Sequence, residues 1–107
     1  MIEILQSEAY KRWFKGLRDT VAKARINARI RRLSFGHMGD CKAVGEGVFE
    51  LRIDHGPGYR VYFVQRGSVL TLLLCGGDKR SQSADIRRAI EIANTWSRWD
   101  AEEEGSA

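Results

Sequence analysis

The stretch that most constrains the fold is an apolar run from Val69 to Cys75, in which only Thr71 is polar. A strand with one face in water alternates polar and apolar side chains. This run does not alternate, so it predicts a central strand that is covered on both faces. Gly76 and Gly77 follow it. Because glycine adopts positive φ easily, we expect a sharp turn there, with room for another group beside the chain.

Two amphipathic helices are predicted earlier in the chain, after a short N-terminal strand within residues 1–6. Ser7 is a suitable N-cap for the first helix, and Asp19 or Thr20 for the second. Because the joint between the helices is short, they should form an antiparallel hairpin. The apolar stripes are Tyr10, Trp13, Phe14 and Leu17 in the first helix, and Ala22, Ile26, Ile30 and Leu33 in the second.

A β-hairpin is predicted over residues 48–64, after a possible short strand at 41–44. The first half of the hairpin alternates as a half-exposed strand does, with Glu50 and Arg52 on its outward face. In the second half, Arg60 and Tyr62 are expected to face outward. After the glycines, Ser81 or Ser83 can cap a C-terminal helix. Its expected buried stripe is Ile86, Ala89, Ile90 and Ala93, with Trp96 as an extension.

The chain has 107 residues, enough for one domain and too few for two. We expect residues 1–98 to form that domain and residues 99–107 to be a mobile acidic tail. No segment resembles a secretory signal, and no apolar run approaches the roughly 20 residues that span a bilayer. A cytoplasmic protein without a membrane segment is therefore expected, with both cysteines reduced.

The net charge of +4 understates how basic the body of the chain is, because four of the fourteen acidic residues lie within residues 100–104. A basic body suits an anionic partner. It is equally compatible with a solvated basic surface and an acidic tail that aids solubility.

Basic and aromatic side chains gather near the hairpin turn and near the end of the apolar strand. If these strands are neighbours, as sequential strands usually are, the side chains can converge on one concave surface. Guanidinium groups bind phosphate oxygens, and an aromatic ring can stack on an unpaired base. Alternatively, these side chains are only the solvent-exposed face of a sheet. The set comprises Arg52, His55, Arg60, Tyr62, Lys79 and Arg80.

Single residues leave alternatives open. His55 can act as a general acid or base near neutral pH, or it is only a turn residue. The second helix's arginines, among them Arg25, Arg29 and Arg32, can track a nucleic-acid backbone, form a solvated face or dock an acidic partner. No metal-ligand spacing, nucleotide-binding loop or nucleophile motif is present, so neither a metal nor a cofactor is expected.

The order of the elements, together with two motifs, resembles the RelE/HigB-like toxins of type II toxin–antitoxin systems, in the RelE/ParE superfamily. The first motif is Gly58-Tyr59-Arg60, which is shared broadly. The second, more specific one is Leu74-Cys-Gly-Gly-Asp-Lys-Arg-Ser-Gln82, and it leads into Asp85. The closest likeness is to the branch called addiction module killer proteins, and it covers the chain from Met1 to about Arg98. The resemblance implies an α+β domain with an antiparallel-type sheet: an N-terminal strand and helical hairpin, then an antiparallel meander and a C-terminal helix.

In function, the resemblance implies a toxin that a cognate antitoxin neutralises. It further implies an endoribonuclease that cuts messenger RNA on the ribosome without a metal and so inhibits translation. By position, Arg60 matches the arginine that these toxins use at the scissile phosphate, and Arg52 matches a basic residue on the preceding strand. The candidate catalytic residues are thus Arg60, Lys79, Arg52 and His55, and the candidate RNA-binding residues are Arg80, Tyr62, Tyr59, Arg29 and Arg32.

The sequence departs from the RelE pattern at two positions. Glu50 stands where RelE has a lysine, and Ala84 where RelE has a catalytic tyrosine. The general acid is therefore open, with His55, Tyr59 and Tyr62 as candidates. Two other functions also remain open. Toxins of the ParE group share this fold but act by binding DNA gyrase, and the chain can also be a non-catalytic protein-interaction module.

Overall fold

The computed structural model describes the backbone of residues 1–106 and the side chains of residues 1–96. The predicted order of elements is confirmed. The expected mobile tail, residues 99–107, lies outside the residues whose side chains are described. The elements are β1 (Glu3–Gln6), α1 (Glu8–Gly16), α2 (Thr20–Ser34), β2 (Cys41–Gly45), β3 (Val48–Ile53), β4 (Tyr59–Arg66), β5 (Leu70–Asp78), a short 3-10 helix η1 (Lys79–Ser81) and α3 (Gln82–Ser106).

Five strands form one sheet in the order β1-β5-β4-β3-β2. Strands β2 to β5 are an antiparallel meander, as predicted. Strand β1 instead runs parallel to β5, with Glu3 opposite Leu70 and Gln6 opposite Leu73, so the sheet is mixed. The reason is the helical hairpin, which carries the chain back over the sheet before the meander begins.

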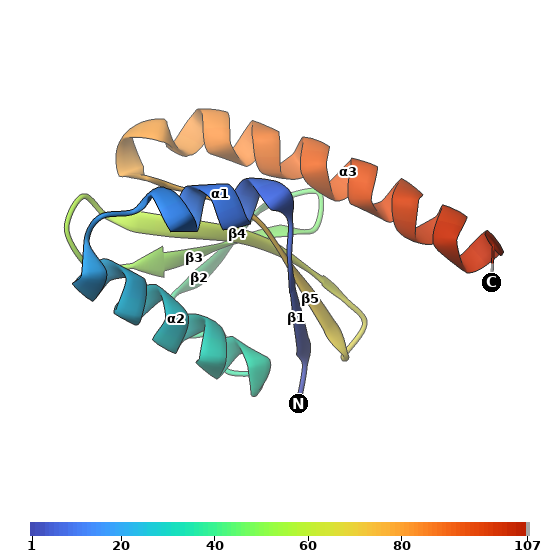
Figure 1. Ribbon diagram of the computed structural model, residues 1–107, viewed down its shortest axis with the longest axis horizontal. Coiled ribbons are helices and arrows are strands. Elements are labelled where there is room, and N and C mark those ends of the chain that lie inside the picture. The colour runs from blue at the N-terminus through green and yellow to red at the C-terminus, as the bar shows by residue number, and fades with distance from the viewer. Residues whose placement is uncertain (107) are drawn as a thin grey trace.

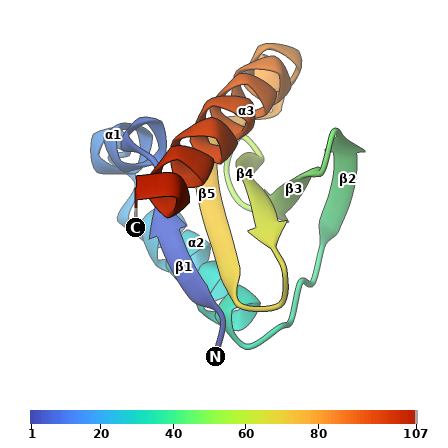
Figure 2. The same ribbon diagram turned by 90° about the vertical axis from the view of Figure 1, so that its right-hand side faces the viewer.

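Helices cover both faces of this sheet (Figures 1 and 2). On one face, α1 and α2 supply Tyr10, Ile26 and Leu33 to a core that includes Leu51 and Phe63. On the other face, α3 contributes the buried residues of its predicted stripe, which are Ala89 and Ala93. Among the described residues, no helix is long and apolar enough to cross a bilayer.

Capping residues act where the sequence predicted them. The Ser7 hydroxyl accepts a hydrogen bond from the Tyr10 backbone N–H at the start of α1. The Asp19 carboxylate accepts one from the Ala22 N–H at the start of α2. Each side chain satisfies an N–H group that the first turn of a helix leaves unpaired.

The apolar run forms β5, and its prediction as a strand buried on both faces is confirmed. Residues 71–75 are all buried, although β4 rather than β5 occupies the centre of the sheet. Opposite β4, Tyr62 pairs with Cys75 and Phe63 with Leu73, so Leu74 is an extra residue. This bulge places both Leu74 and Cys75 on the α3 side.

The predicted turn at Gly76 and Gly77 is wrong, because β5 continues through both to Asp78. Neither glycine has a positive φ. They are required by close approach instead: a Cβ at Gly76 would overlap the indole ring of Trp13, and one at Gly77 would overlap the carboxylate of Asp85. The glycines therefore let α1 pack on one face of β5 and the start of α3 on the other.

The expectation that β3 is half-exposed is also wrong. Its polar and apolar residues alternate as predicted, but Glu50 on the expected outward face is fully buried. On strand β4, Tyr62 was assigned to the same outward face and is also fully buried. Helix α3 covers this face, so its polar side chains must find partners within the protein.

Replacing Gly76 with alanine should destabilise the fold by about 1–3 kcal/mol, because the added methyl group must displace the Trp13 ring. The matched control is Gly16→Ala in the last turn of α1, where no atom lies within 4 Å of the new Cβ. That change should be neutral, or stabilising by up to about 1 kcal/mol. Urea unfolding of both variants measures the difference, and equal midpoints would contradict the close-approach argument.

Candidate functional site

A basic cleft of about 380 Å³ lies where β3 and β4 meet the end of β5. Strand register creates it: Arg52 on β3 lies opposite Arg60 on β4, and Arg60 lies opposite Gly77 on β5. Lys79 follows two residues later. The structure thus brings Arg52, Arg60 and Lys79 to one place, together with the glycine-rich turn between β3 and β4. The full lining is Asp40, Arg52, Ile53, Asp54, Gly56, Pro57, Gly58, Arg60 and Lys79.

Beneath the arginines lies the buried carboxylate of Glu50, whose side chain is 0% exposed. Its Oε1 lies 2.9 Å from Nε of Arg52 and 3.5 Å from Nη1 of Arg60. Its Oε2 accepts hydrogen bonds from the Tyr62 hydroxyl at 3.1 Å and from Nε2 of Gln82 at 2.8 Å. One carboxylate therefore joins β3, β4 and the first residue of α3.

Opposing effects set the pKa of Glu50. Burial raises it, because a charged carboxylate is poorly solvated inside a protein. Hydrogen bonds from Arg52, Gln82 and Tyr62, together with the charge of Arg60, lower it and outweigh burial, so the pKa lies below its ordinary value of 4.5. Glu50 is thus ionised at neutral pH and compensates part of the arginine charge.

The two arginines differ in exposure. The Arg52 side chain is 35% exposed and that of Arg60 is 11% exposed. The Arg60 Nε is buried and has no hydrogen-bond partner among the described residues. Fixed guanidinium groups that line a cleft are well suited to a phosphate group, whose oxygens can accept hydrogen bonds from their accessible N–H groups.

The turn that carries Lys79 is held by a capping box. The Asp78 carboxylate accepts from the Arg80 N–H at 2.9 Å and pairs with the Arg80 guanidinium at 3.2 Å. This partnership lowers the pKa of Asp78. Lys79 is exposed at the cleft, whereas Arg80, 85% exposed, does not belong to the described lining.

The described cleft lining includes neither candidate tyrosine. Tyr62 is fully buried and donates to Glu50, and burial is the main cause of its raised pKa. Tyr59 lies on the opposite face of the sheet, where its ring packs edge-on against Trp13, with 6.4 Å between ring centres. In this arrangement neither ring is free to stack on a base.

His55 is engaged elsewhere. Its Nε2 lies 2.9 Å from Oδ2 of Asp19, the N-cap of α2, and the described cleft lining does not include it. The pKa of Asp19 is lowered first by the hydrogen bond from Ala22 and then by that from His55. The structure thus places His55 as a tie between the hairpin turn and α2.

The arginines of α2 divide into two kinds. Arg29 donates to the backbone carbonyl oxygens of Met38, Asp40 and Arg52, and so ties α2 to the segment that precedes β2 and to β3. Arg25 and Arg32 are exposed and line a second groove of about 410 Å³. This groove shares Ile53 and Asp54 with the basic cleft, so the two are adjacent.

Sequence reasoning missed Glu50 and Gln82 as members of the site. In the sequence, Glu50 stands out only as a departure from the RelE pattern, and Gln82 only as part of the motif from Leu74 to Gln82. A signal for Glu50 exists in the sequence. Glu50 and Arg52 are two residues apart on one strand and so share a face, and the hairpin places Tyr62 and Arg60 opposite them. That combination provides three donors for one carboxylate.

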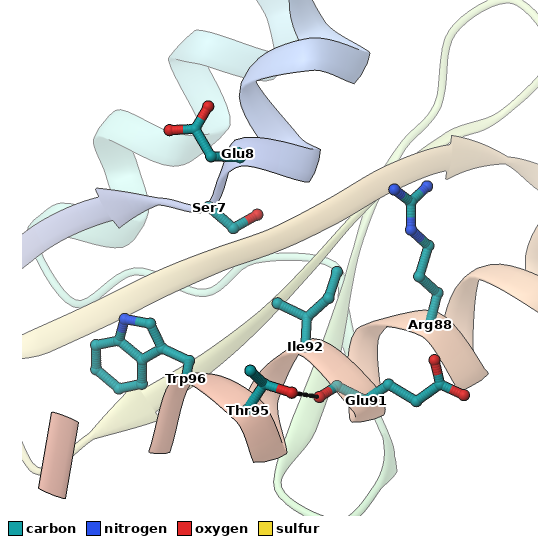
Figure 3. Close-up of a pocket in the computed structure, with 7 residues that line it drawn as sticks. All are labelled: Ser7, Glu8, Arg88, Glu91, Ile92, Thr95 and Trp96. Carbon is teal, nitrogen blue, oxygen red and sulfur yellow. Dashed lines mark hydrogen bonds between the residues drawn. The ribbon is translucent and has the colours of Figure 1, made fainter. Parts of the chain in front are cut away.

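A larger groove of about 510 Å³ lies between the start of α1 and one side of α3. Figure 3 shows Ile92 of α3 pointing toward Ser7, with Trp96 beside it, whereas the Glu8 carboxylate points away from α3. The charged residues of the described lining are Glu8, Arg88 and Glu91. This described lining holds a single cation, so the basic cleft is the stronger candidate for an anionic ligand.

The described residues also limit other kinds of site. No group of three His, Cys, Asp or Glu side chains that could hold a metal occurs among them. Cys41 and Cys75 are free thiols. Burial raises the pKa of Cys75 to about 12, so it is not a reactive nucleophile.

Comparison with known proteins adds two findings. The family described as "Phage derived protein Gp49-like (DUF891)" matches residues 12–97, a range that includes the basic cleft and Gln82. An uncharacterized protein of Haemophilus influenzae is 52% identical over 92 residues, which cover 86% of this chain and 93% of that protein.

If Arg29 is a structural tie, Arg29→Ala should lower the free energy of unfolding by about 1–3 kcal/mol, because three carbonyl oxygens lose their donor. Arg25→Ala, an equal loss of charge on the exposed face of α2, should stay within about 0.5 kcal/mol of the wild type. Chemical unfolding at pH 7 measures both. Equal stability of the two variants would show that Arg29 is not a tie.

The depressed pKa of Glu50 makes stability depend on pH. Its contribution should be fully present above about pH 4.5 and should be lost as pH falls through the lower folded-state pKa. Glu50→Gln should therefore cost about 1–3 kcal/mol at pH 7, and its deficit should shrink in acid. Unfolding curves between pH 7 and pH 3 test this, with Glu8→Gln, whose carboxylate is 82% exposed, as the control. A deficit that is constant with pH would contradict the prediction.

Proposed function

The chain belongs to the Gp49-like family of phage-derived proteins, and from this we infer that it is the toxin of a type II toxin–antitoxin system. The family is related to the RelE superfamily of toxins. We further propose that the toxin is an endoribonuclease that cuts messenger RNA on the ribosome, in the cytoplasm, and so stops translation.

One observation carries the proposal: Arg52, Arg60 and Lys79 lie in a single cleft, with both arginines held by a buried carboxylate. Charged donors fixed before the substrate arrives stabilise charge that develops in a transition state, because they need not reorganise. Such a cleft suits a phosphodiester, whose oxygens gain negative charge when a nucleophile attacks phosphorus.

In the proposed reaction, the ribose 2′-oxygen loses its proton and bonds to the adjacent phosphorus, and the bond to the 5′-oxygen breaks. The departing 5′-oxygen takes up a proton, so the products are a 2′,3′-cyclic phosphate and a 5′-hydroxyl. Arg60 and Arg52 stabilise the phosphoryl oxygens, and Lys79 lies at the rim, where it can serve the phosphate or the leaving oxygen. The lining carboxylates Asp40 and Asp54 are the candidates to accept the 2′-proton.

The adjacent groove on α2 gives the RNA a continuing path. Arg25 and Arg32 are exposed there, and the groove meets the cleft at Ile53 and Asp54. Side chains of this kind attract a phosphate backbone without reading its sequence. Arg80, exposed beside Lys79, can do the same at the other end of the cleft.

A cognate antitoxin is the proposed protein partner. An acidic or amphipathic segment of it would cover the basic surface formed by the cleft and by the α2 groove. Because such a contact depends on charge, the complex should weaken as salt increases.

The decisive experiment is brief induction in bacteria, with the 5′ ends of all messages mapped before and after. The wild type should create new ends within translated frames, and Arg60→Ala should reduce them on the order of 10²-fold, since it removes a charge at the phosphate. Lys79→Ala should also reduce cleavage. Arg87→Ala removes an exposed charge of α3 outside the described cleft and should leave cleavage unchanged.

The other outcomes separate the alternatives. Full cleavage by Arg60→Ala would remove the central residue of the proposal. Growth arrest with intact messages and altered DNA supercoiling would favour a gyrase-binding toxin. Harmless expression without any change in RNA would favour a non-catalytic interaction module.

A further inference from the structure

We propose that Glu50 is a positioning residue for the cleft: from beneath, its carboxylate sets the orientation of Arg52 and Arg60 and fixes the turn that carries Lys79. This inference deepens the proposed function and rests on it. It assigns Glu50 no contact with the substrate and no role as a proton acceptor.

Burial and its partners argue against Glu50 as the base. Its Oε1 accepts a hydrogen bond from Nε of Arg52 and lies 3.5 Å from Nη1 of Arg60, an ion-pair distance. Its Oε2 accepts hydrogen bonds from Tyr62 and Gln82. The side chain is 0% exposed, so a substrate hydroxyl does not reach it in this arrangement. A buried carboxylate engaged by four side chains holds its donors in place instead of taking a substrate proton.

Each bond to Glu50 leaves other donors for a ligand. Arg52 uses its Nε for Glu50, so both terminal nitrogens remain available on a side chain that is 35% exposed. Arg60 pairs with Glu50 through Nη1, 3.5 Å from Oε1, and its side chain still lines the cleft. An anion in the cleft can accept from the guanidinium groups that line it, so the orientation set by Glu50 favours ligand binding.

The bond to Gln82 extends this control to Lys79. Gln82 is the first residue of α3 and follows η1, Lys79–Ser81, without a break. Because Gln82 donates to the same carboxylate at 2.8 Å, the short helix is anchored to β3 at its C-terminal end. Asp78 anchors it at the other end. The three basic residues of the cleft thus share one buried reference point.

The test compares wild-type protein with Glu50→Gln, which keeps the shape of the side chain but removes its charge, and with Gln82→Met, which cuts only the link to α3. The control is Leu72→Ala, which truncates a buried side chain of the core on the α3 side, outside the described cleft lining. Solution conditions are adjusted until the variants have equal thermal stability, so that differences in activity do not report loss of fold.

Two quantities are measured: the single-turnover rate on ribosomes programmed with messenger RNA, and the affinity for a 2′-O-methyl oligoribonucleotide that cannot be cut. Glu50→Gln should lower the rate on the order of 10²-fold, as expected for misplaced groups, with a smaller loss of affinity. Gln82→Met should lower the rate less, and Leu72→Ala should leave it unchanged. A wild-type rate for Glu50→Gln, or a rate loss equal to that of Leu72→Ala, would overturn the proposal.

A second readout does not depend on RNA cleavage. Inorganic phosphate is titrated while the arginine Nε–H signals are followed by nuclear magnetic resonance. Phosphate should shift the Arg52 and Arg60 signals of the wild type, and it should bind Glu50→Gln more weakly. Loss of the carboxylate charge alone would strengthen phosphate binding, so weaker binding reports misplaced guanidinium groups. If the wild type cuts no RNA, the proposed endonuclease function fails, and the phosphate titration alone judges Glu50. Equal phosphate affinity of wild type and Glu50→Gln, or no shift in the wild type, would overturn the positioning role.

Discussion

The polar layer beneath α3 depends on a single buried negative charge. Because the Glu50 side chain is fully buried on the face of the sheet that α3 covers, water does not solvate its carboxylate, and an uncompensated charge there would be strongly destabilising. Glu50 is compensated by two arginines, a phenol and an amide from three elements. The same requirement that makes the fold possible also determines where the guanidinium groups lie. In this protein, the contacts that compensate the buried charge of Glu50 are the same contacts that hold Arg52 and Arg60 in the basic cleft.

The remainder of the cleft is assembled by the sheet rather than by side-chain interactions. Antiparallel pairing puts Arg52 opposite Arg60 and Arg60 opposite Gly77. Lys79 follows Gly77 by two residues, so three segments each place one positive charge in the cleft. The two glycines of β5 allow Trp13 of α1 and Asp85 of α3 to approach the strand closely just before Lys79. Rigid strands are a suitable support for donors whose positions must vary little.

Periodicity in the sequence predicted the elements well because it reflects which face of a helix or strand is buried. The stripes of α1, α2 and α3, the caps Ser7 and Asp19, and the buried strand β5 all follow from local pattern. Alternation on β3 predicted the correct two faces, but it could not show that α3 would cover the polar one. The burial of Glu50 and Tyr62 is thus a tertiary property.

For the candidate site, the convergence of Arg52, Arg60 and Lys79 was predictable, since hairpin neighbours share an edge. The partners of other candidates were not. Arg29 looks like any exposed arginine until the segment before β2 and strand β3 place three carbonyl oxygens around it. His55 is bound by Asp19, which lies 36 positions earlier in the chain. Such long-range pairs cannot be predicted from the periodicity of a single sequence, because periodicity shows only which face of one helix or strand is buried. The roles of all these residues in RNA cleavage remain predictions.

The parallel pairing of β1 with β5 also constrains the order in which the fold can form during synthesis. Strand β1 finds its partner only when residues 70–73 have been made, so the entropy of closing the long intervening loop opposes this contact. The carboxylate of Glu50 likewise gains its bond to Gln82 only after all five strands have been made. A polypeptide that stops before β5 has the helical hairpin and strands β1 to β4, but β1 has no partner strand and the turn that carries Lys79 is absent. Assembly of the cleft therefore requires synthesis through Gln82, and a product terminated earlier lacks the arrangement on which a toxic activity would depend.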